Sequence, residues 1–270
     1  MKYSPLFSVT RKLPNYMLFS VDLNVKFRDY EEWNSILMNT YDILLYSTFY
    51  VGIVCVFIAE FYIPQLLKYG KTWKASNNYW FNLTCSKSTF THFYLIAIVL
   101  STYNLFEKCN LLTLCVFIHS VRRLYECFFI TKWGHSKIHL SHYLVGIWFY
   151  TTLNIGIAFK NGETENRLVS VVMFIAASLD QAVNHQHLSK LKKYSQPSYG
   201  LFRYICCAHY FDEFLIYLSF LLMNVGTRAL LAHCVVWILV NLGTSSHETG
   251  NWYLQKFGYR PRWYMLPYVF

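Results

Sequence analysis

The sequence predicts an all-α protein with about seven helices that cross a membrane. Only 14% of the 270 residues are charged, whereas 55% are hydrophobic and 20% are aromatic. An average soluble protein has about 25% charged residues, so a soluble chain of this composition could not cover its surface. The net charge of +10 in so apolar a chain indicates basic loops on the cytoplasmic side of a membrane and not a nucleic-acid-binding protein.

Seven apolar stretches predict the membrane helices. A helix needs about 20 mostly apolar residues to cross the hydrocarbon core of a bilayer, and the candidates are 41–63, 90–107, 110–130, 138–159, 167–183, 208–224 and 228–246. The first, fourth and seventh are the clearest, whereas the third and fifth carry polar residues. Residues 1–40 contain no comparable run, so we expect an extramembrane segment at 1–40 and one membrane domain at 41–270.

The basic residues of the loops predict the orientation. The connections 64–89, 131–137 and 184–204, together with 247–270, hold 13 Lys and Arg, whereas the alternate connections hold four. Basic loops stay on the cytosolic side, so the N-terminus is predicted to be lumenal and the C-terminus cytosolic. The sequon at Asn82 then falls in a cytosolic loop, where it would remain unglycosylated.

The third stretch contains the main group of ionisable residues, His119, Arg122, Arg123 and Glu126. Such residues are costly at membrane depth and mark a functional site by default. Spacings of three, four and seven place them on one helical face, where Glu126 can pair with Arg122 or Arg123. Two interpretations stay open for the pair, a structural lock between helices or part of a functional site. His119 favours the functional one.

Further polar residues lie at the ends of the other stretches. Glu60 closes the first stretch, where its carboxyl could reach the interface without a function. Three histidines, His185, His187 and His209, lack the fourth ligand and the spacing of a zinc site, so we predict no metal.

The connection after the fifth stretch combines basic and aromatic side chains, which are Lys190, Lys192, Lys193, Arg203, Tyr194, Tyr199 and Tyr204. Such a group suits a phosphorylated ligand that stacks, such as a nucleotide. Cytosolic charge beside interfacial aromatic rings explains the same residues. No G-x-G-x-x-G or Walker loop is present, so a soluble nucleotide-binding fold is not predicted.

The segment His119-Ser120-Val121-Arg122-Arg123-Leu124-Tyr125-Glu126-Cys127 resembles the H-S-x-R-R-x-x-E-C signature of the polyprenal (polyprenol) reductase branch of the steroid 5α-reductase family. Other segments resemble the branch in the same order, namely Tyr69-Gly70-Lys71-Thr72, His92-Phe93-Tyr94, 194–204, 208–213 and 266–270. The resemblance therefore runs from about residue 60 to the end of the sequence.

The resemblance implies a seven-helix reductase of the endoplasmic reticulum membrane, with the reductase part at about 110–270. It also implies that NADPH is bound in the cytosolic half, by Gln181, His185, Lys192, Tyr194, His209, Glu213 and Tyr253. Steroid-reducing members have Asn, Asp and Asn in place of Gln181, His185 and His209, which favours a long-chain polyisoprenoid substrate over a steroid. The reaction implied is reduction of the α-isoprene double bond on the way from polyprenol to dolichol, which serves protein N-glycosylation.

The chemistry of hydride transfer restricts which substrate is expected and which residues can act as the hydrogen-bond donor. The accepting double bond must tolerate developing negative charge, so an unsaturated aldehyde, polyprenal, is the expected species and the allylic alcohol is not. A hydrogen-bond donor must then stabilise the carbonyl oxygen. The candidates are His119, Ser120, Tyr125 and a protonated Glu60. Ser120 stands where steroid-reducing members have Tyr, and a long gap before Trp252-Tyr253 makes the counterpart of His247 ambiguous.

Two alternatives remain beside this prediction. The chain could reduce steroid enones or trans-2-enoyl thioesters, as other members of the family do. It could also be a membrane scaffold or a transporter, although transporters often show Gly- or Pro-interrupted spans in two related halves. No such pattern is visible here.

Overall fold

The computed structural model describes residues 23–70, 72–73, 76–160, 168–192, 195–259 and 261–270. By its internal contacts the chain divides into two units, Met1–Ile43 and Leu44–Phe270. The sites described below lie in the second unit. Tyr194, which the resemblance assigns to the cofactor, lies outside the described residues, as does Lys193.

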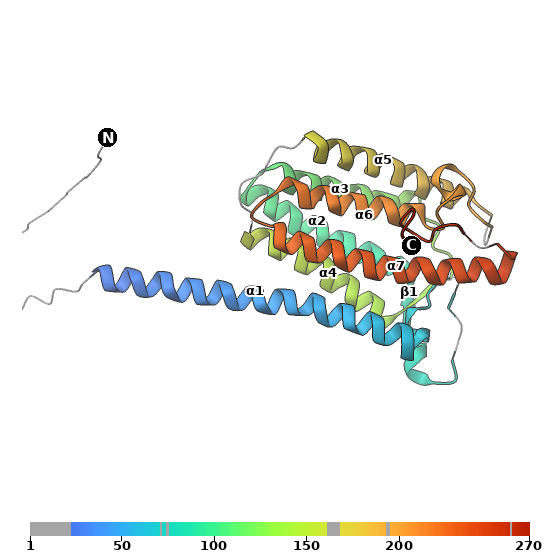
Figure 1. The fold of residues 1–270 in the computed structure, drawn as a ribbon, viewed down its shortest axis with the longest axis horizontal. Coiled ribbons are helices and arrows are strands. Elements are labelled where there is room, and N and C mark those ends of the chain that lie inside the picture. The colour runs from blue at the N-terminus through green and yellow to red at the C-terminus, as the bar shows by residue number, and fades with distance from the viewer. Residues whose placement is uncertain (1–22, 71, 74–75, 161–167, 193–194, 260) are drawn as a thin grey trace, which may run out of the picture. The chain divides into compact units, whose positions relative to one another are not determined.

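Seven α-helices make up most of the described chain (Figure 1). They are α1 Leu23–Tyr62, α2 Phe90–Glu107, α3 Leu111–Phe129, α4 Leu140–Lys160, α5 Leu168–Lys190, α6 Ala208–Met223 and α7 Arg228–Phe257. Two short antiparallel strands, β1 Thr84–Ser86 and β2 Lys137–His139, pair Thr84 with His139. The all-α membrane class that the composition predicts is thereby supported.

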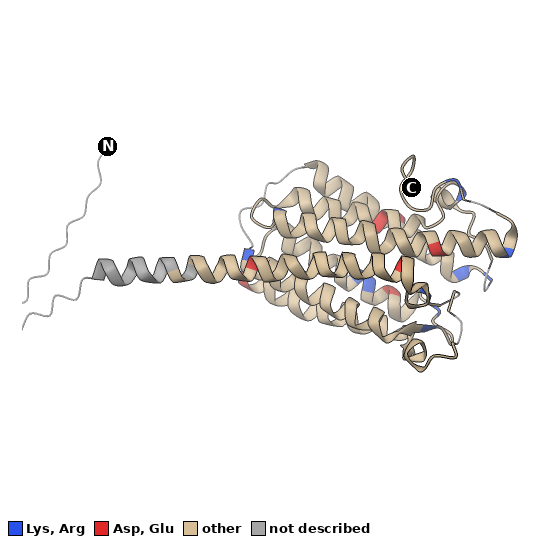
Figure 2. Ribbon diagram, turned by 60° about the horizontal axis from the view of Figure 1, so that its bottom comes forward, with Lys and Arg blue, Asp and Glu red and all other residues tan. Residues whose placement is uncertain are grey.

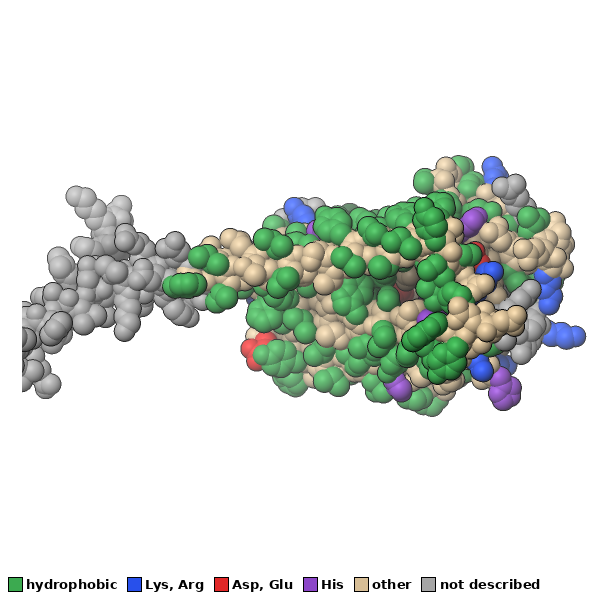
Figure 3. Space-filling view, turned by 90° about the horizontal axis from the view of Figure 1, so that it is seen from below, with side chains coloured by type: hydrophobic (Ala, Val, Ile, Leu, Met, Phe, Trp, Pro, Cys, Tyr) green, Lys and Arg blue, Asp and Glu red, His purple; other side chains and the backbone are tan. Residues whose placement is uncertain are grey.

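Four of these helices are long and apolar enough to cross a membrane. The candidate spans are Ser35–Tyr62, Lys87–Glu107, Leu168–Lys190 and Arg228–Phe257. Hydrophobic side chains also cover much of the face seen in Figure 3, as a surface in contact with lipid requires. The four spans do not include α4, although its stretch is among the clearest in the sequence.

The helix ends follow local signals, but three helices run longer than hydropathy predicts. Asn110 caps α3 by a reciprocal hydrogen-bond pair with Thr113, and Gly258 ends α7 in the left-handed conformation at φ 64°. Helix α1 begins at Leu23, α5 continues to Lys190 and α7 continues to Phe257. Hydropathy marks the apolar part of a helix, so it misses turns that continue into polar sequence.

Small residues allow the helices to approach closely. A side chain at Gly146 of α4 would meet the Phe93 ring of α2 at 2.4 Å, and one at Gly52 of α1 would meet Trp237 of α7 at 2.7 Å. Close approach at small residues is a common way to pack helices in a membrane. The resulting bundle places α2 beside α3 and α4, and α6 beside α5 and α7.

One end of the bundle, here called the loop end, carries the connections 64–89, 130–139 and 191–207 and the segment 258–270. Helices α1, α3, α5 and α7 end there, whereas α2, α4 and α6 begin there. The final segment folds back on the start of α6, because Cys206 N–H donates to the carbonyl of Trp263 at 2.9 Å and Cys207 N–H to that of Tyr264 at 3.1 Å. Many of the described charged residues lie at this end or within the bundle next to it (Figure 2).

Candidate functional site

The carboxylate of Glu126 lies between two guanidinium groups of its own helix. It is 1% exposed, and its Oε1 accepts a hydrogen bond from Arg122 Nη1 at 2.5 Å while Oε2 pairs with Arg123 Nη1. The i+3 and i+4 spacing of a helix brings these side chains together without help from other elements. The face that the sequence predicts is therefore formed within α3.

Two neighbouring helices attach to this group. His185 of α5 has its Nδ1 2.7 Å from Glu126 Oε2, and Arg123 Nη2 donates to the Tyr94 hydroxyl of α2 at 2.9 Å. The contacts therefore connect α2 and α5 to α3 inside the bundle.

Gln181 of α5 joins this group to α6. Its side-chain oxygen accepts a hydrogen bond from Arg122 Nη2 at 2.5 Å. Its amide nitrogen donates to Glu213 Oε2 at 2.6 Å and to the backbone carbonyl of His209 at 3.0 Å. An amide suits this position because it accepts from a cation on one side and donates to an anion on the other.

His119 closes the arrangement. The side chain is 2% exposed, with Nε2 3.5 Å from Glu213 Oε1 and Nδ1 3.3 Å from Arg122 Nη2. We call the whole set the polar network; its members are Tyr94, His119, Arg122, Arg123, Glu126, Gln181, His185 and Glu213.

Charge balance makes the polar network tolerable inside the bundle. Its two guanidinium groups face two carboxylates, and the histidines and the glutamine supply the remaining hydrogen bonds, so no ionic group is left uncompensated in a low-dielectric interior. Two buried nitrogens of the network, Nε of Arg122 and Nε2 of His119, have no hydrogen-bond partner among the described residues. Since such groups normally find a partner, the Nε of Arg122, which is always a donor, suits an acceptor on a ligand.

The network contains three of the seven residues that the resemblance assigns to a cofactor, and a fourth contacts it. Gln181, His185 and Glu213 contribute side chains, and His209 contributes its carbonyl. Lys192 is exposed in the connection after α5, and Tyr253 of α7 is buried against Cys206 and Cys207.

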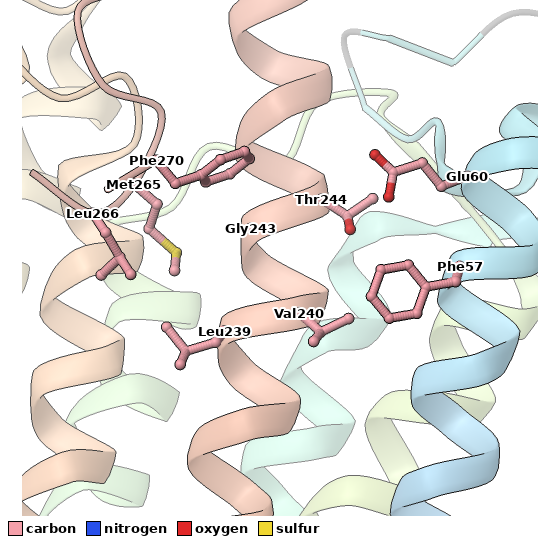
Figure 4. A pocket seen from close by; sticks show the side chains of 9 residues that line it. All are labelled: Phe57, Glu60, Leu239, Val240, Gly243, Thr244, Met265, Leu266 and Phe270. Carbon is pink, nitrogen blue, oxygen red and sulfur yellow. The ribbon is translucent and has the colours of Figure 1, made fainter. Parts of the chain in front are cut away.

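A separate pocket of about 290 Å³ lies at the loop end between α1, α7 and the final segment. Its lining is mostly apolar and consists of Phe57, Glu60, Leu239, Val240, Gly243, Thr244, Met265, Leu266 and Phe270 (Figure 4). Glu60 is the charged member of this set, and its Oε1 lies 3.6 Å from Nδ1 of His247. The edge of the His247 ring meets Tyr264, with the centroids 5.1 Å apart. The structure thus gives His247 a defined neighbour.

Two of the predicted catalytic candidates do not join either site. The hydroxyl of Ser120 donates to the carbonyl of Val116 in its own helix at 2.8 Å. Tyr125 is 55% exposed and packs against Phe129, with the ring centroids 4.9 Å apart. The i+3 and i+4 spacing predicts the face with His119 and Glu126, whereas Tyr125 lies on another face of α3.

The sequence analysis misses several contacts. Tyr94 and Tyr69 stand within segments that resemble the family, but nothing in the sequence indicates that Tyr94 meets Arg123. Asn184 donates to the carboxylates of both Asp180 and Asp212, at 3.2 and 2.7 Å, which the i+4 spacing predicts only for Asp180. Contacts between helices distant in the sequence have no periodic signal. Among the described residues, no group of three or more His, Cys, Asp or Glu is arranged to hold a metal ion.

An apolar helical bundle with a buried polar network is typical of a membrane-embedded protein. Residues 137–270 match the family model described as 3-oxo-5-alpha-steroid 4-dehydrogenase. The chain belongs to this steroid 5α-reductase family, as the sequence segments predict.

Within this family, the chain is similar to several curated proteins that are named polyprenal reductase. It is 37% identical to the polyprenal reductase of Saccharomyces cerevisiae over 224 residues, which cover 78% of this chain and 87% of the yeast protein. It is 27% identical to the polyprenal reductase of Xenopus tropicalis over 57% of this chain and 59% of the frog protein. The mouse polyprenal reductase is 26% identical over 53% of this chain and 49% of its own length.

Replacing Glu126 tests the role of the network in folding. Glu126→Ala leaves Arg122 and Arg123 without their shared carboxylate. We therefore expect the free energy of unfolding to fall by about 3–5 kcal/mol, the usual cost of breaking a buried ion pair. The yield of monodisperse protein in size-exclusion chromatography should fall strongly. The matched control is Glu107→Ala, at an exposed position at the end of α2, which should leave the yield unchanged. Equal yields for the two variants would contradict a structural role.

Proposed function

We propose that this chain is a polyprenal reductase, which reduces the α-isoprene double bond of a long-chain polyprenal in the conversion of polyprenol to dolichol. The observation that carries the proposal is the 37% identity to the yeast polyprenal reductase over 78% of the chain. The structure supports it with a mostly apolar pocket beside an ionisable pair, since an isoprenoid end needs apolar walls and its aldehyde needs a polar partner.

The chemistry of the substrate dictates what the site must supply. Hydride addition to the β-carbon of an unsaturated aldehyde breaks the carbon–carbon π bond and moves an electron pair toward the carbonyl oxygen. A proton then adds to the α-carbon and regenerates the aldehyde, now saturated. The protein must therefore hold a donor at the oxygen, where the negative charge develops.

NADPH is the cofactor that we assign to the polar network. When bound, it supplies the hydride. The buried, unpartnered Nε of Arg122 fits an acceptor such as a carboxamide or phosphate oxygen. The network residues Gln181, His185 and Glu213 would bind and orient the cofactor, as would His209. Lys192, exposed at the loop end, would contact its 2′-phosphate.

The pair Glu60–His247 is the donor that we assign to the aldehyde oxygen. Glu60 lines the pocket, and in its protonated form the pair can offer a hydrogen bond to an oxygen there. His119, the donor that the sequence favours, is buried against Glu213 and Arg122. We therefore assign His119 the role of holding Glu213 in position within the polar network, where we place the cofactor.

The orientation that we propose places the loop end in the cytosol and the chain in the endoplasmic reticulum membrane with seven spans. The basic loops support this orientation, and in the structure the Asn82 amide is already engaged with Ser76, to whose carbonyl it donates at 2.6 Å. A glycosylated Asn82, or a C-terminal tag protected from protease in sealed microsomes, would overturn the orientation.

A substrate comparison tests the function. Membranes that carry the chain, supplied with NADPH, should convert polyprenal to its α-saturated aldehyde and should leave polyprenol unchanged. Steroid enones and trans-2-enoyl thioesters should turn over far more slowly. Faster reduction of either would assign the chain to another activity of the family, and no reduction of any of them would favour a non-enzymatic role.

Lys192→Gln tests the cofactor assignment. We expect the KM for NADPH to rise roughly two- to five-fold, the effect of losing a solvent-exposed charge pair, and the KM for NADH to stay unchanged. The effect should shrink at high salt, because exposed charges are screened. Lys132→Gln, exposed in the connection before β2, is the control. An equal rise in the KM for NADPH and for NADH would contradict a contact between Lys192 and the 2′-phosphate.

Glu60→Gln and His119→Ala separate the two candidate donors. Losing a donor to the developing oxyanion costs about 10²–10³ in kcat, so Glu60→Gln should lower kcat by this factor with the KM for NADPH unchanged. His119→Ala should mainly raise the KM for NADPH. Steady-state kinetics on protein normalised for folded amount would measure both. The opposite pattern would return the donor role to His119.

A further inference from the structure

Two tyrosine hydroxyls from distant parts of the sequence meet at the loop end. The hydroxyl oxygens of Tyr69, in the connection after α1, and Tyr210, in the first turn of α6, are 2.7 Å apart. Both side chains are partly buried. Neither residue has a role in the proposed site so far, although Tyr69 stands in a segment that resembles the family.

The backbone around Tyr69 is built to hold this side chain in place. Thr72 Oγ1 accepts a hydrogen bond from Tyr69 N–H at 3.1 Å and donates to the Tyr69 carbonyl at 3.0 Å. Gly70 follows at φ +57°, a conformation that favours glycine, and its N–H donates to the carbonyl of Lys137 at 2.9 Å. The ammonium of Lys87 lies 5.2 Å from the centre of the Tyr69 ring. The turn is thus tied to β2, and its aromatic side chain points to the bundle.

Tyr210 belongs to the turn that carries the cofactor residues of α6. It directly follows His209, whose carbonyl accepts from Gln181, and it precedes Glu213 by less than one helical turn. The rings of His209 and Tyr210 lie with their centroids 4.3 Å apart. A shift of Tyr210 would therefore move two groups that contact Gln181.

The hydroxyl of Tyr69 stays protonated. Burial raises the pKa of Tyr69, and its hydrogen bond to Tyr210 acts in the opposite direction. The net shift is upward, so the group stays a neutral phenol at physiological pH and keeps its proton for donation.

We propose that Tyr69 is a positioning residue: through its hydroxyl bond to Tyr210, it fixes the first turn of α6, and with it Glu213 and the carbonyl of His209. This inference rests on the proposed function, since it deepens the assignment of the cofactor site. It gives the Tyr-Gly-x-Thr segment a physical role, in which Thr72 and Gly70 shape the turn and Tyr69 makes the contact.

The variants Tyr69→Phe, Tyr210→Phe and the double variant test the proposal, because phenylalanine keeps the ring packing and removes only the hydroxyl. A typical hydrogen bond contributes about 0.5–1.5 kcal/mol, which corresponds to about 2- to 12-fold in an equilibrium constant. We expect the Kd for NADPH, measured by equilibrium binding to purified protein, to rise by such a factor in each single variant. The double variant should be no worse than the singles, since all three remove one bond.

The control is Tyr50→Phe, which removes a hydroxyl 3.1 Å from His233 Nε2, a contact between α1 and the first part of α7 away from the loop end. It should leave the Kd for NADPH unchanged. An unchanged Kd in Tyr69→Phe, or strictly additive effects in the double variant, would overturn the proposal. If the wild-type chain binds NADPH with the expected pattern but does not reduce polyprenal, the proposed substrate fails and the positioning role stands.

Discussion

The architecture of the loop end depends on one buried carboxylate. Glu126 receives Arg122 and Arg123 from its own helix and His185 from α5, and each of its partners makes a further contact. Arg123 reaches Tyr94 on α2, whereas Arg122 reaches Gln181 and, through it, Glu213 on α6. A membrane interior offers no water to satisfy these groups. The helices must therefore satisfy them jointly, which fixes their relative positions better than lipid-like apolar contacts can.

The same constraint explains why the polar network and the pocket are separate. A network of buried ionic groups leaves little surface for an apolar chain, whereas the pocket between α1, α7 and the final segment has mostly apolar walls, with Glu60 as its charged residue. A reductase of a membrane lipid needs both environments, one for a charged, water-soluble cofactor and one for an isoprenoid. The first turn of α6 contacts the polar network, and the middle of α7 lines the pocket. The position of these two segments relative to one another therefore decides whether the cofactor and the substrate can meet.

The sequence predicts the helices well because apolar length is a local property. It places α2, α3 and α6 within a residue or two at each end, and the helical spacing brings His119 and Glu126 to one face. It does not predict that Gln181 bridges Arg122 and Glu213, because this contact joins three helices and has no periodic signal. It misses the polar turns at the ends of α1, α5 and α7 for the complementary reason, since hydropathy ends before the helix does. The sequence also does not predict the pocket, because its residues come from α1, α7 and the final segment, whereas the sequence favours His119 on α3 as the donor.

Glu126 and His185 are in direct contact, and this contact suggests why the branches of the family differ at the position of His185. By the resemblance described above, steroid-reducing members are expected to carry Asp where this chain has His185. At 2.7 Å from Glu126 Oε2, an aspartate carboxylate would face a second carboxylate in a low-dielectric interior, where like charges repel strongly. Histidine avoids this, since one ring nitrogen can donate to Glu126 while the ring carries no obligatory charge. The length of the Gln181 side chain also matters, because its amide contacts both the guanidinium of Arg122 and the carboxylate of Glu213. The shorter Asn that the resemblance gives to the steroid branch would not reach as far. The signature on α3 and the residues on α5 are therefore in direct contact, and we expect an exchange of one set without the other to disturb the hydrogen bonds of the network.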